Sequence, residues 1–409
     1  MRIETGTGLS TLENVVAAAA EATRTARASC ERPLVALLFA THNYPTSDLR
    51  AAAAAVAKEL PAGVQVVGGT VNGLTYDEAR HDALFANKHA VAVVLFGGAE
   101  LKVGVGFVPS PMSGPVEAGR SLAKQVQEQL GERATGGILL GTGLAAGATP
   151  CDQGLLDGIR SINPRLRLSG TGLSGGMRVT GLIEHGFAFT PDRIEQLGCV
   201  LICFAGNIDM GFATANGMQA VGTGGFVTDA EGVMIKEIDG RPAAEAVLDL
   251  LAPKDDPESR ALFAKNPMIM SIERGVTLAA ADPEGDFYWC HMPIMFTPEG
   301  YALDYFSARK GMALSVVKID PAACMQAIGQ AAIMLKEDAA QEEFDTIIAF
   351  SCSLRGFTLG TDVAGEDTEL RRHLKAKHQL GIVANGEIGC YRHGRPFYTG
   401  WVYALFGLA

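Results

Sequence analysis

The stretch that decides the fold is LVALLFATHNYPTSDLRAAAAAVAKEL at residues 34–60. Its six apolar residues at 34–39 predict a buried strand, and the Ala-rich segment 48–60, after a polar loop, predicts a helix. A second apolar run at 64–67 leads into GGTVNG at residues 68–73, which is typical of a tight turn. The order strand, loop, helix, strand is a unit of α/β proteins.

The same order of elements returns about a hundred residues later. An apolar run at 137–140 predicts a strand, residues 153–162 predict a helix, and GTGLSG at residues 170–175 predicts a second glycine-rich turn. This string imitates a dinucleotide fingerprint, but strand-like residues follow it where that motif requires a helix, so a Rossmann site is not expected. Recurrence of a whole unit predicts an internally duplicated N-terminal half.

A third, looser copy lies near the end of the chain. It has an apolar run at 346–350, the predicted loop SCSLRG at 351–356, a predicted helix at 367–377 and the predicted turn NGEIG at 385–389. Loops after equivalent strands should cluster in space, and ligands of α/β folds favour such loops. The three glycine-rich turns are therefore expected to meet.

Two pairs of apolar runs close the first two copies, and each is predicted to form an antiparallel strand pair. They are residues 90–96 with 101–107, and 199–204 with 208–214. The sequence thus predicts an α/β protein with layered mixed sheets, built from repeated strand-loop-helix-strand units and internally duplicated. The expected domains are 1–220 and 221–409.

Composition excludes several classes of function. The chain has 34 Lys and Arg against 45 Asp and Glu, a net charge of -11, which argues against a nucleic-acid partner. Its eight cysteines are scattered without the spacing of a disulfide framework or zinc site. No apolar run approaches the roughly 18 residues that cross a membrane, so no membrane partner is expected and the cytoplasm is the expected compartment.

Three motifs resemble those of a known family, the FIST proteins. FSCSLRG at 350–356 resembles the family's Phe-Ser-Cys-x-x-Arg signature, and GEIG at 386–389 resembles its Gly-Glu-Ile-Gly turn. IDGRPA at 238–243 resembles its Asp-Gly-x-Pro-Ala step into a helix. The N-terminal match is weaker: GGTVNG at 68–73 stands where the family often has Gly-Cys-Ser-Ser-x-Gly, so roles of that Cys and those Ser do not carry over. The resemblance implies a FIST N-terminal domain followed by a FIST C-terminal domain.

The resemblance also implies a function. The chain is expected to be a sensory protein that binds an amino-acid-like or other small polar metabolite in signal transduction. Because it has no kinase, cyclase or DNA-binding signature, its output should pass through a partner or a homo-oligomer. It is expected not to be an enzyme, although a hydrolase or transferase using Cys352 or Glu387 stays open.

Some family members imply an alternative, a haem-binding nitric-oxide sensor that regulates a histidine kinase. The chain has no Cys-x-x-Cys-His attachment motif, so only non-covalent haem b is compatible with the sequence. A haem iron commonly takes a neutral imidazole, and His42, in the loop after the first strand, is the preferred axial ligand.

Polar side chains in the glycine-rich turns and the 351–356 loop are the candidate ligand-binding residues. Arg355 offers a planar fork suited to a carboxylate, and Glu387 could hold a ligand amine. The alternative is that Arg355 pairs with Glu387 and ties two loops together. The complete candidate set is Thr70, Asn72, Thr171, Ser174, Ser351, Cys352, Arg355, Asn385 and Glu387.

Overall fold

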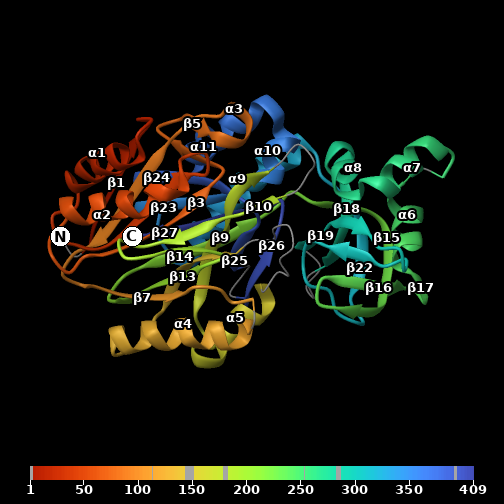
Figure 1. Ribbon diagram of the computed structural model, residues 1–409, viewed down its shortest axis with the longest axis horizontal. Coiled ribbons are helices and arrows are strands. Elements are labelled where there is room, and N and C mark those ends of the chain that lie inside the picture. Colours follow the sequence, from red (N-terminus) through yellow and green to blue (C-terminus); the bar gives the residue numbers. More distant parts are fainter. Residues whose placement is uncertain are drawn as a thin grey trace.

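A large body built around three sheets and a smaller lobe built around a fourth make up the protein (Figure 1). Both chain termini lie on the large body, at the end away from the lobe. The computed structural model describes residues 3–112, 114–142, 152–177, 183–252, 254–281, 287–390 and 394–409.

The first unit of the large body contains four strands and two long helices. Asn14 caps the first helix by accepting a hydrogen bond from the backbone N–H of Ala17, and a row of alanines lets both helices lie close to the sheet. The elements are β1 (Glu4–Ser10), α1 (Val15–Arg27), β2 (Pro33–Thr41), α2 (Leu49–Glu59), β3 (Gln65–Val71) and β6 (Val91–Gly97).

The second unit contains the same set of elements, four strands and two helices. Its two helices cross closely because each presents a glycine: a β-carbon on Gly119 would lie 2.1 Å from the carbonyl oxygen of Leu155. The elements are β7 (Leu101–Val108), α4 (Pro115–Leu130), β8 (Gly136–Thr142), α5 (Asp152–Ile162), β9 (Arg167–Met177) and β13 (Cys199–Gly206).

The third unit is interrupted after its first strand by the smaller lobe. Asp320 caps the helix that resumes it, accepting from the backbone N–H of Ala323. The elements are β14 (Met210–Ala215), α9 (Pro321–Ala339), β23 (Glu343–Cys352), α10 (Ser353–Leu359), α11 (Gly365–His373), β24 (Lys375–Ala384) and β27 (Tyr403–Leu408).

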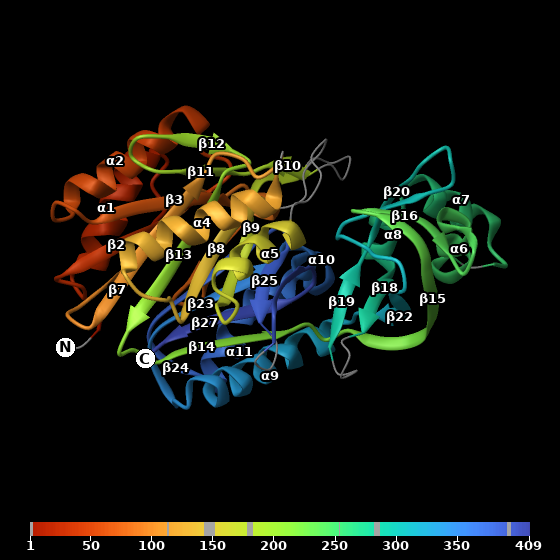
Figure 2. The same cartoon turned by 90° about the horizontal axis from the view of Figure 1, so that it is seen from below.

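All three units use one strand order, which runs first, last, second, third. The sheets contain β1-β6-β2-β3, β7-β13-β8-β9 and β14-β27-β23-β24. In each, the second and third strands are parallel and the last strand is antiparallel to the second. The inner faces share one apolar core, while the helix pairs cover three different outer sides (Figures 1 and 2).

Short strands after each third strand tie the units together. β4 (Gly73–Tyr76) and β5 (Ala79–Asp82) join the third sheet, and β11 (Phe187–Phe189) and β12 (Ile194–Gln196) join the first. β25 (Glu387–Cys390) and β26 (Pro396–Thr399) join the second sheet, where β10 (Ile183–His185) also pairs with β9. Each unit therefore extends the sheet of another unit, which locks the three together.

The smaller lobe contains the fourth sheet and three helices. It leaves and rejoins the large body through neighbouring strands, since Gln219 pairs with Lys318. Its elements are β15 (Gln219–Glu231), β16 (Met234–Ile238), β17 (Arg241–Pro242), α6 (Ala243–Leu251), α7 (Pro257–Lys265), α8 (Pro267–Arg274), β18 (Val276–Ala281), β19 (Tyr288–His291), β20 (Pro293–Phe296), β21 (Ala302–Asp304) and β22 (Ala313–Lys318).

The structure confirms the predicted α/β fold with layered mixed sheets and repeated units. The predicted antiparallel pairs are wrong, because β6 and β7 lie in different sheets, as do β13 and β14. Each connection passes from one unit to the next rather than closing a hairpin. The predicted domain boundary near residue 220 stays a prediction; β14 ends at Ala215 and β15 begins at Gln219.

The prediction that the first two glycine-rich segments form turns is also wrong. Residues 68–71 belong to β3, and residues 170–175 all lie within β9. Their glycines serve close packing: a β-carbon on Gly69 would lie 2.2 Å from a methyl carbon of Leu173. At the C-terminal copy, the predicted 351–356 loop begins helix α10 at Ser353, and the predicted helix 367–377 ends at His373, before β24.

Candidate functional site

The parallel pairing between the second and third strands of each unit ends at equivalent positions, which lie together in the large body. Strand register makes the ends equivalent, since Thr41 pairs with Val71, Thr142 with Leu173, and Cys352 with Ala384. The residues that follow Val71, Leu173 and Ala384 are therefore counterparts. They are Asn72, Ser174 and Asn385.

These three counterparts form a closed hydrogen-bond network that we call the axial triad. Ser174 Oγ donates to Asn72 Oδ1 at 2.6 Å, Asn72 Nδ2 donates to Asn385 Oδ1 at 2.8 Å, and Asn385 Nδ2 donates to Ser174 Oγ at 2.7 Å. All three side chains are buried. Segments 68–73, 170–175 and 385–389 therefore meet, as the repeated sequence predicted.

Three hydroxyl groups lie around the axial triad. Ser353, next to the candidate residue Cys352, accepts from Asn72 Nδ2 at 2.6 Å and donates to the carbonyl oxygen of Ala384. Thr171 donates to the carbonyl oxygen of Gly386. Thr70 accepts from the backbone N–H of Phe187, so it holds β11 in place.

Arg355 and Ser351 lie in a second group, centred on Glu366. Arg355 Nε donates to Glu366 Oε1 at 2.7 Å, and Ser351 Oγ donates to Glu366 Oε2 at 2.7 Å. Arg355 also donates to the carbonyl oxygen of Cys324 and lies over the ring of Tyr403. The alternative that Arg355 pairs with Glu387 is wrong, because its carboxylate partner is Glu366.

Arg355 is completely buried, and its Nη1 atom has no hydrogen-bond partner among the described residues. Burial tends to lower the pKa of the Arg355 guanidinium, but the charge of Glu366 overrides this and the net pKa is raised. The group therefore keeps its charge inside the protein. Glu366 is a residue that sequence reasoning missed, since nothing in its local pattern distinguishes it from a solvated helix residue.

Cys352 and Glu387 form a third group, at the ends of β23 and the start of β25. Glu387 is completely buried, and neither carboxylate oxygen has a hydrogen-bond partner among the described residues. Burial raises the pKa of Glu387 well above its usual range, while the adjacent Cys352 thiol and the charge of Arg355 oppose the rise. A carboxyl group held in this way favours its protonated form.

The thiol of Cys352 is also buried. Burial and then the charge of Glu387 raise its pKa well above the usual range. The backbone N–H groups of Leu354, Trp401 and Gly386 act at the sulfur in the opposite direction. Trp401 (φ 57°) and Gly386 (φ 77°) have left-handed backbone, a conformation uncommon for a tryptophan.

The smaller lobe covers this thiol and carboxyl pair. Tyr305 and Phe306, directly after β21, pack in one apolar cluster with Cys352, Leu354 and Trp401. Burial, and after it the charges of Cys352 and Glu387, raise the pKa of Tyr305 well above its usual range. The lobe therefore completes the site, a contribution that no sequence motif indicated.

His42 lies just after β2, and its backbone N–H donates to the carbonyl oxygen of Val71. Burial lowers the pKa of its imidazole. Nδ1 is buried and has no hydrogen-bond partner among the described residues, and Nε2 lies 2.7 Å from where a β-carbon on Gly176 would be. His42 is half-buried, and the haem alternative stays a prediction.

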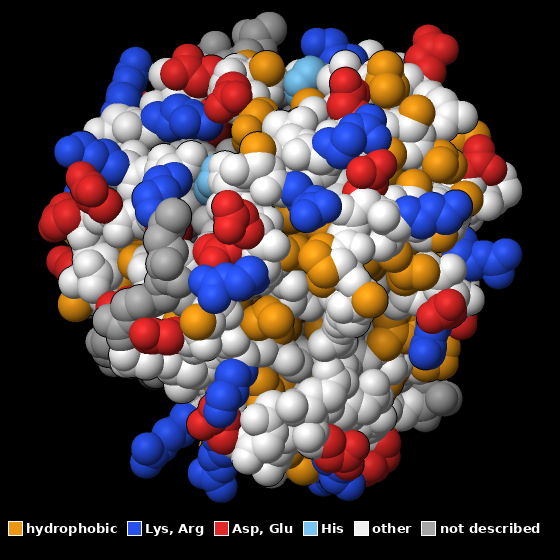
Figure 3. Space-filling view, turned by 90° about the vertical axis from the view of Figure 1, so that its left-hand side faces the viewer, with side chains coloured by type: hydrophobic (Ala, Val, Ile, Leu, Met, Phe, Trp, Pro, Cys, Tyr) orange, Lys and Arg blue, Asp and Glu red, His pale blue; other side chains and the backbone are white. Residues whose placement is uncertain are grey.

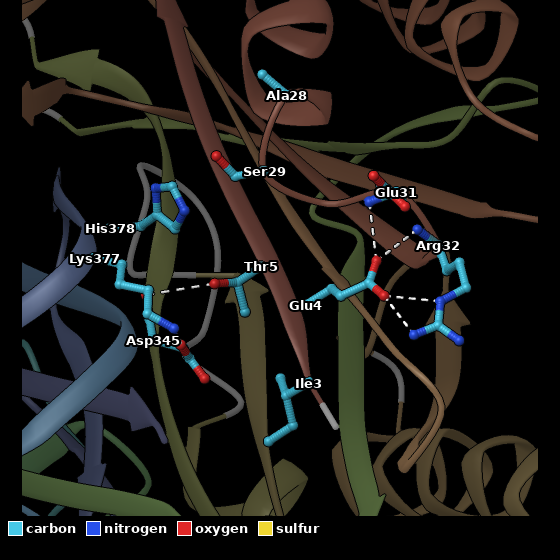
Figure 4. A pocket seen from close by; sticks show the side chains of 10 residues that line it. All are labelled: Ile3, Glu4, Thr5, Ala28, Ser29, Glu31, Arg32, Asp345, Lys377 and His378. Carbon is cyan, nitrogen blue, oxygen red and sulfur yellow. Dashed lines mark hydrogen bonds and ion pairs between the residues drawn. The ribbon is translucent and has the colours of Figure 1, made fainter. Parts of the chain in front are cut away.

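A separate pocket of about 660 Å³ lies at the opposite ends of the strands (Figure 4). It is lined by ion pairs, Arg32 with Glu4 at 2.6 Å and Lys377 with Asp345, and by His378. None of the candidate ligand-binding residues lines it. Near the chain termini, positive and negative side chains are interspersed on the surface without a continuous patch of either sign (Figure 3).

Two kinds of feature are absent from the described residues. No group of three or more His, Cys, Asp and Glu side chains there could hold a metal ion. No helix in that part of the chain is long and apolar enough to cross a membrane.

Fold and site together define a class: an α/β protein of three equivalent units that converge on a buried polar site, with a lobe inserted in the third. The FIST N domain matches residues 35–241, and the FIST C domain matches residues 243–390. The chain therefore belongs to the FIST family, as its motifs indicated. FIST domains are small-ligand sensory domains of signalling proteins.

Other comparisons are more distant. The sequence has no match among curated proteins. A cyanuric acid hydrolase whose structure is described as an evolutionary innovation by structural concatenation is 11% identical over 100% of both chains, with a TM-score of 0.33. The cyanuric acid hydrolase from A. caulinodans is 9% identical over 99% of this chain and 98% of that one, with a TM-score of 0.39. Both scores are below 0.5, so neither likeness bears on the activity of this protein.

Proposed function

We propose that this chain is a sensory protein that binds a small, amino-acid-like or other polar ligand beside Glu387, and that it does so without turning the ligand over. The observation that carries this proposal is the carboxyl group of Glu387, which is fully buried with both oxygens unpartnered among the described residues. Buried polar groups are nearly always hydrogen-bonded, and exceptions need a reason. A ligand that brings N–H donors is such a reason.

The chemistry of the surroundings selects the part of the ligand that faces Glu387. An ammonium or amide N–H would supply the missing donors, and a charged donor would also stabilise the carboxylate form. The axial triad offers a rigid polar wall beside this point, because its three side chains already fix one another. We therefore favour a ligand with an amine over one that has only a carboxylate.

Arg355 is less suited to a ligand carboxylate than its residue type suggests. Its guanidinium is held by Glu366, by the carbonyl oxygen of Cys324 and by the ring of Tyr403, which leaves Nη1 without a partner among the residues that the structure describes. Direct recognition by Arg355 would use this single nitrogen. Its larger contribution in the proposed function is to hold the segment that contains Cys352 and Ser353.

Signal output is proposed to pass through the smaller lobe to a partner such as a histidine kinase, or to a second copy of the chain. Tyr305 and Phe306 cover the site, so a ligand beside Glu387 would change how these two residues pack. A ligand shifts a conformational equilibrium only through different contacts in the two states. The lobe provides those contacts because it forms one wall of the site.

A thermal-shift screen tests the proposal. Amino acids and small amines are compared with carboxylates that lack an amine, using the parent protein, Glu387→Gln and, as a matched control on the surface, Glu369→Gln. An amine ligand at a hundred times its dissociation constant should add about 2.7 kcal/mol to the stability of the parent and of the control, but little to Glu387→Gln. Equal stabilisation of all three proteins would contradict ligand binding at Glu387.

The haem alternative is tested on the same preparation. Because Nδ1 of His42 is buried and its ring lies against Gly176, we propose that purified protein mixed with hemin gives no stoichiometric Soret band. A band that responds to nitric oxide and disappears in His42→Ala would replace the amine-ligand proposal by the gas-sensor alternative.

A further inference from the structure

We propose that the smaller lobe is a hinged cover of the site: it rotates away from the large body as one piece, about the two segments that connect them, and so admits a ligand to Glu387. The inference rests on the proposed function for what is admitted, while the opening itself is a property of the protein without ligand.

Some part of the protein has to move before a ligand can reach this site, because Glu387 is fully buried and Cys352 and Trp401 are buried as well. The large body is not suited to this movement, since its three units exchange strands: β4 pairs with β24, β11 with β3, and β25 with β9. Separating the units would break backbone hydrogen bonds of these sheets. The lobe, in contrast, can leave with its own sheet intact, because that sheet contains only strands of the lobe.

Two short neighbouring segments connect the lobe to the large body beside it (Figure 1). Residues 216–218 lie between β14 and β15, and residues 319–320 lie between β22 and α9. Gln219 pairs with Lys318, so both connections leave the lobe at one place. Gly217 has left-handed backbone there (φ 78°), a conformation that most other residues rarely adopt. Hinges are typically a few residues at the ends of elements, in which the backbone dihedral angles change.

Ring contacts join the lobe to the large body on the side away from the hinge segments. Phe397, on β26 of the large body, lies 5.2 Å from Phe287 and 5.9 Å from Trp289 of the lobe, measured between ring centroids. Phe306 of the lobe lies 5.4 Å from Tyr398 of the large body. Apolar contacts of this kind are non-directional, so they can separate and form again without the loss of a strand pairing.

Cysteines on both sides of this interface can report its opening. Cys290 of the lobe and Cys352 of the large body are buried in an apolar cluster that both parts share. The backbone N–H of Cys290 donates to Thr399 Oγ1 of the large body at 2.8 Å, so Cys290 lies at the contact itself. Cys203 is equally buried, but its cluster is formed by residues of the large body. Rotation of the lobe would expose the first two thiols and leave Cys203 covered.

The experiment is alkylation of the native protein with N-ethylmaleimide, without added ligand, followed at each cysteine by peptide mass spectrometry. Each rate is divided by the rate at the same cysteine in the urea-unfolded chain, which removes differences in intrinsic reactivity. Because local opening costs less free energy than global unfolding, Cys290 and Cys352 should react at least about 10-fold faster than Cys203 on this scale. Equal protection of the three thiols would overturn the proposal.

Two matched variants separate lobe opening from global unfolding. Phe397→Leu loses ring contacts that are absent once the lobe has rotated away, so Cys290 and Cys352 should react several-fold faster. Phe344→Leu changes a buried ring inside the large body, whose contacts persist when the lobe opens, so it should accelerate Cys203 alone. Acceleration of all three thiols to the same degree by Phe344→Leu would show that they react only through global unfolding, and the proposal would be wrong.

The same measurements distinguish this proposal from the ligand-binding proposal. Alkylation is followed without ligand, so slow reaction of Cys290 and Cys352 contradicts lobe opening even where an amine stabilises the protein in the thermal-shift screen. Fast reaction of both thiols, together with no stabilisation by any amine, supports lobe opening and contradicts ligand binding at Glu387 alone.

Discussion

Glu387 lowers the stability of the folded protein and is also the central residue of the proposed ligand site. Its carboxyl group is buried without hydrogen-bond partners among the described residues, and burial raises its pKa well above the ordinary value of 4.5. Such a group lowers stability at neutral pH relative to a neutral isostere, because the folded state has to keep the proton or bury the charge. Energetically unfavourable features of this kind are typical of functional sites.

The effect of Glu387→Gln on stability, measured at different pH values, tests whether the pKa of Glu387 is raised. A raised pKa means that the folded state holds the proton more tightly, so the contribution of Glu387 to stability falls as the pH rises above 4.5. The slope is at most about 1.4 kcal/mol per pH unit. Chemical denaturation at pH 5 and pH 8 should show Glu387→Gln gaining stability over the parent as the pH rises.

The control for that measurement is Glu231→Gln. A hydrogen bond and the charge of Lys236 lower the pKa of Glu231, and Lys236 keeps its charge from pH 5 to pH 8, so the contribution of Glu231 should change little over this range. Parallel pH profiles for the parent and Glu387→Gln would show that Glu387 is not a perturbed group.

At the scale of elements, an internal ion pair fixes the segment between β23 and α11. Arg355 on α10 and Glu366 on α11 are joined at 2.7 Å, and Ser351 at the end of β23 donates to the same carboxylate. This arrangement orients Cys352 and Ser353, which lie between Ser351 and Arg355. The Cys-x-x-Arg spacing thus positions the site, while the arginine itself faces Glu366.

Breaking this pair should be costly. Removing one partner of a buried ion pair leaves the other uncompensated, so Arg355→Met should lower the free energy of unfolding by about 3–5 kcal/mol. The double variant Arg355→Met with Glu366→Leu should lose less than the sum of the single variants. Urea denaturation measures both, and an Arg355→Met variant within about 1 kcal/mol of the parent would contradict a structural role.

An exposed ion pair provides the comparison. Arg372 and Glu369 are joined at 2.8 Å on the outer side of α11. Exposed pairs of this kind contribute about 0–1 kcal/mol, so Arg372→Ala should change stability little.

At the scale of the whole molecule, the axial triad is the point where the three units are joined by side chains. Its members lie at equivalent positions but are separated by a hundred residues or more, so each hydrogen bond links two units. Removing any one takes a hydrogen-bond partner away from each of the other two inside the protein, which costs more than the bond itself.

A double-mutant cycle between Asn72→Ala and Asn385→Ala measures this connection. We expect a coupling energy of about 0.5–3 kcal/mol, because the two side chains are in direct contact. Asn163 is a matched buried asparagine that donates to the carbonyl oxygen of Ala134 within the second unit. Asn72→Ala and Asn163→Ala should add to within about 0.5 kcal/mol, and additivity of both cycles would show that the triad does not couple the units.

Much of this architecture follows from the amino-acid sequence alone. The apolar run at 34–39 and the alanines after it specify β2 and α2, because a buried strand and a helix covering it need those side chains. The return of the same order at 137–140 and 346–350 predicted three units, and with them the meeting of Asn72, Ser174 and Asn385.

Only the tertiary structure decided how the units are joined and what each polar side chain touches. Apolar patterning shows that a strand is buried but not beside which strand, so the passage from β6 to β7 between sheets could not be foreseen. Glycine permits a turn and also close packing, and at Gly69 it is Leu173, from another unit, that requires it. The partner of Arg355 and the cover that Tyr305 provides come from distant segments, because contacts between them form only once the chain has folded.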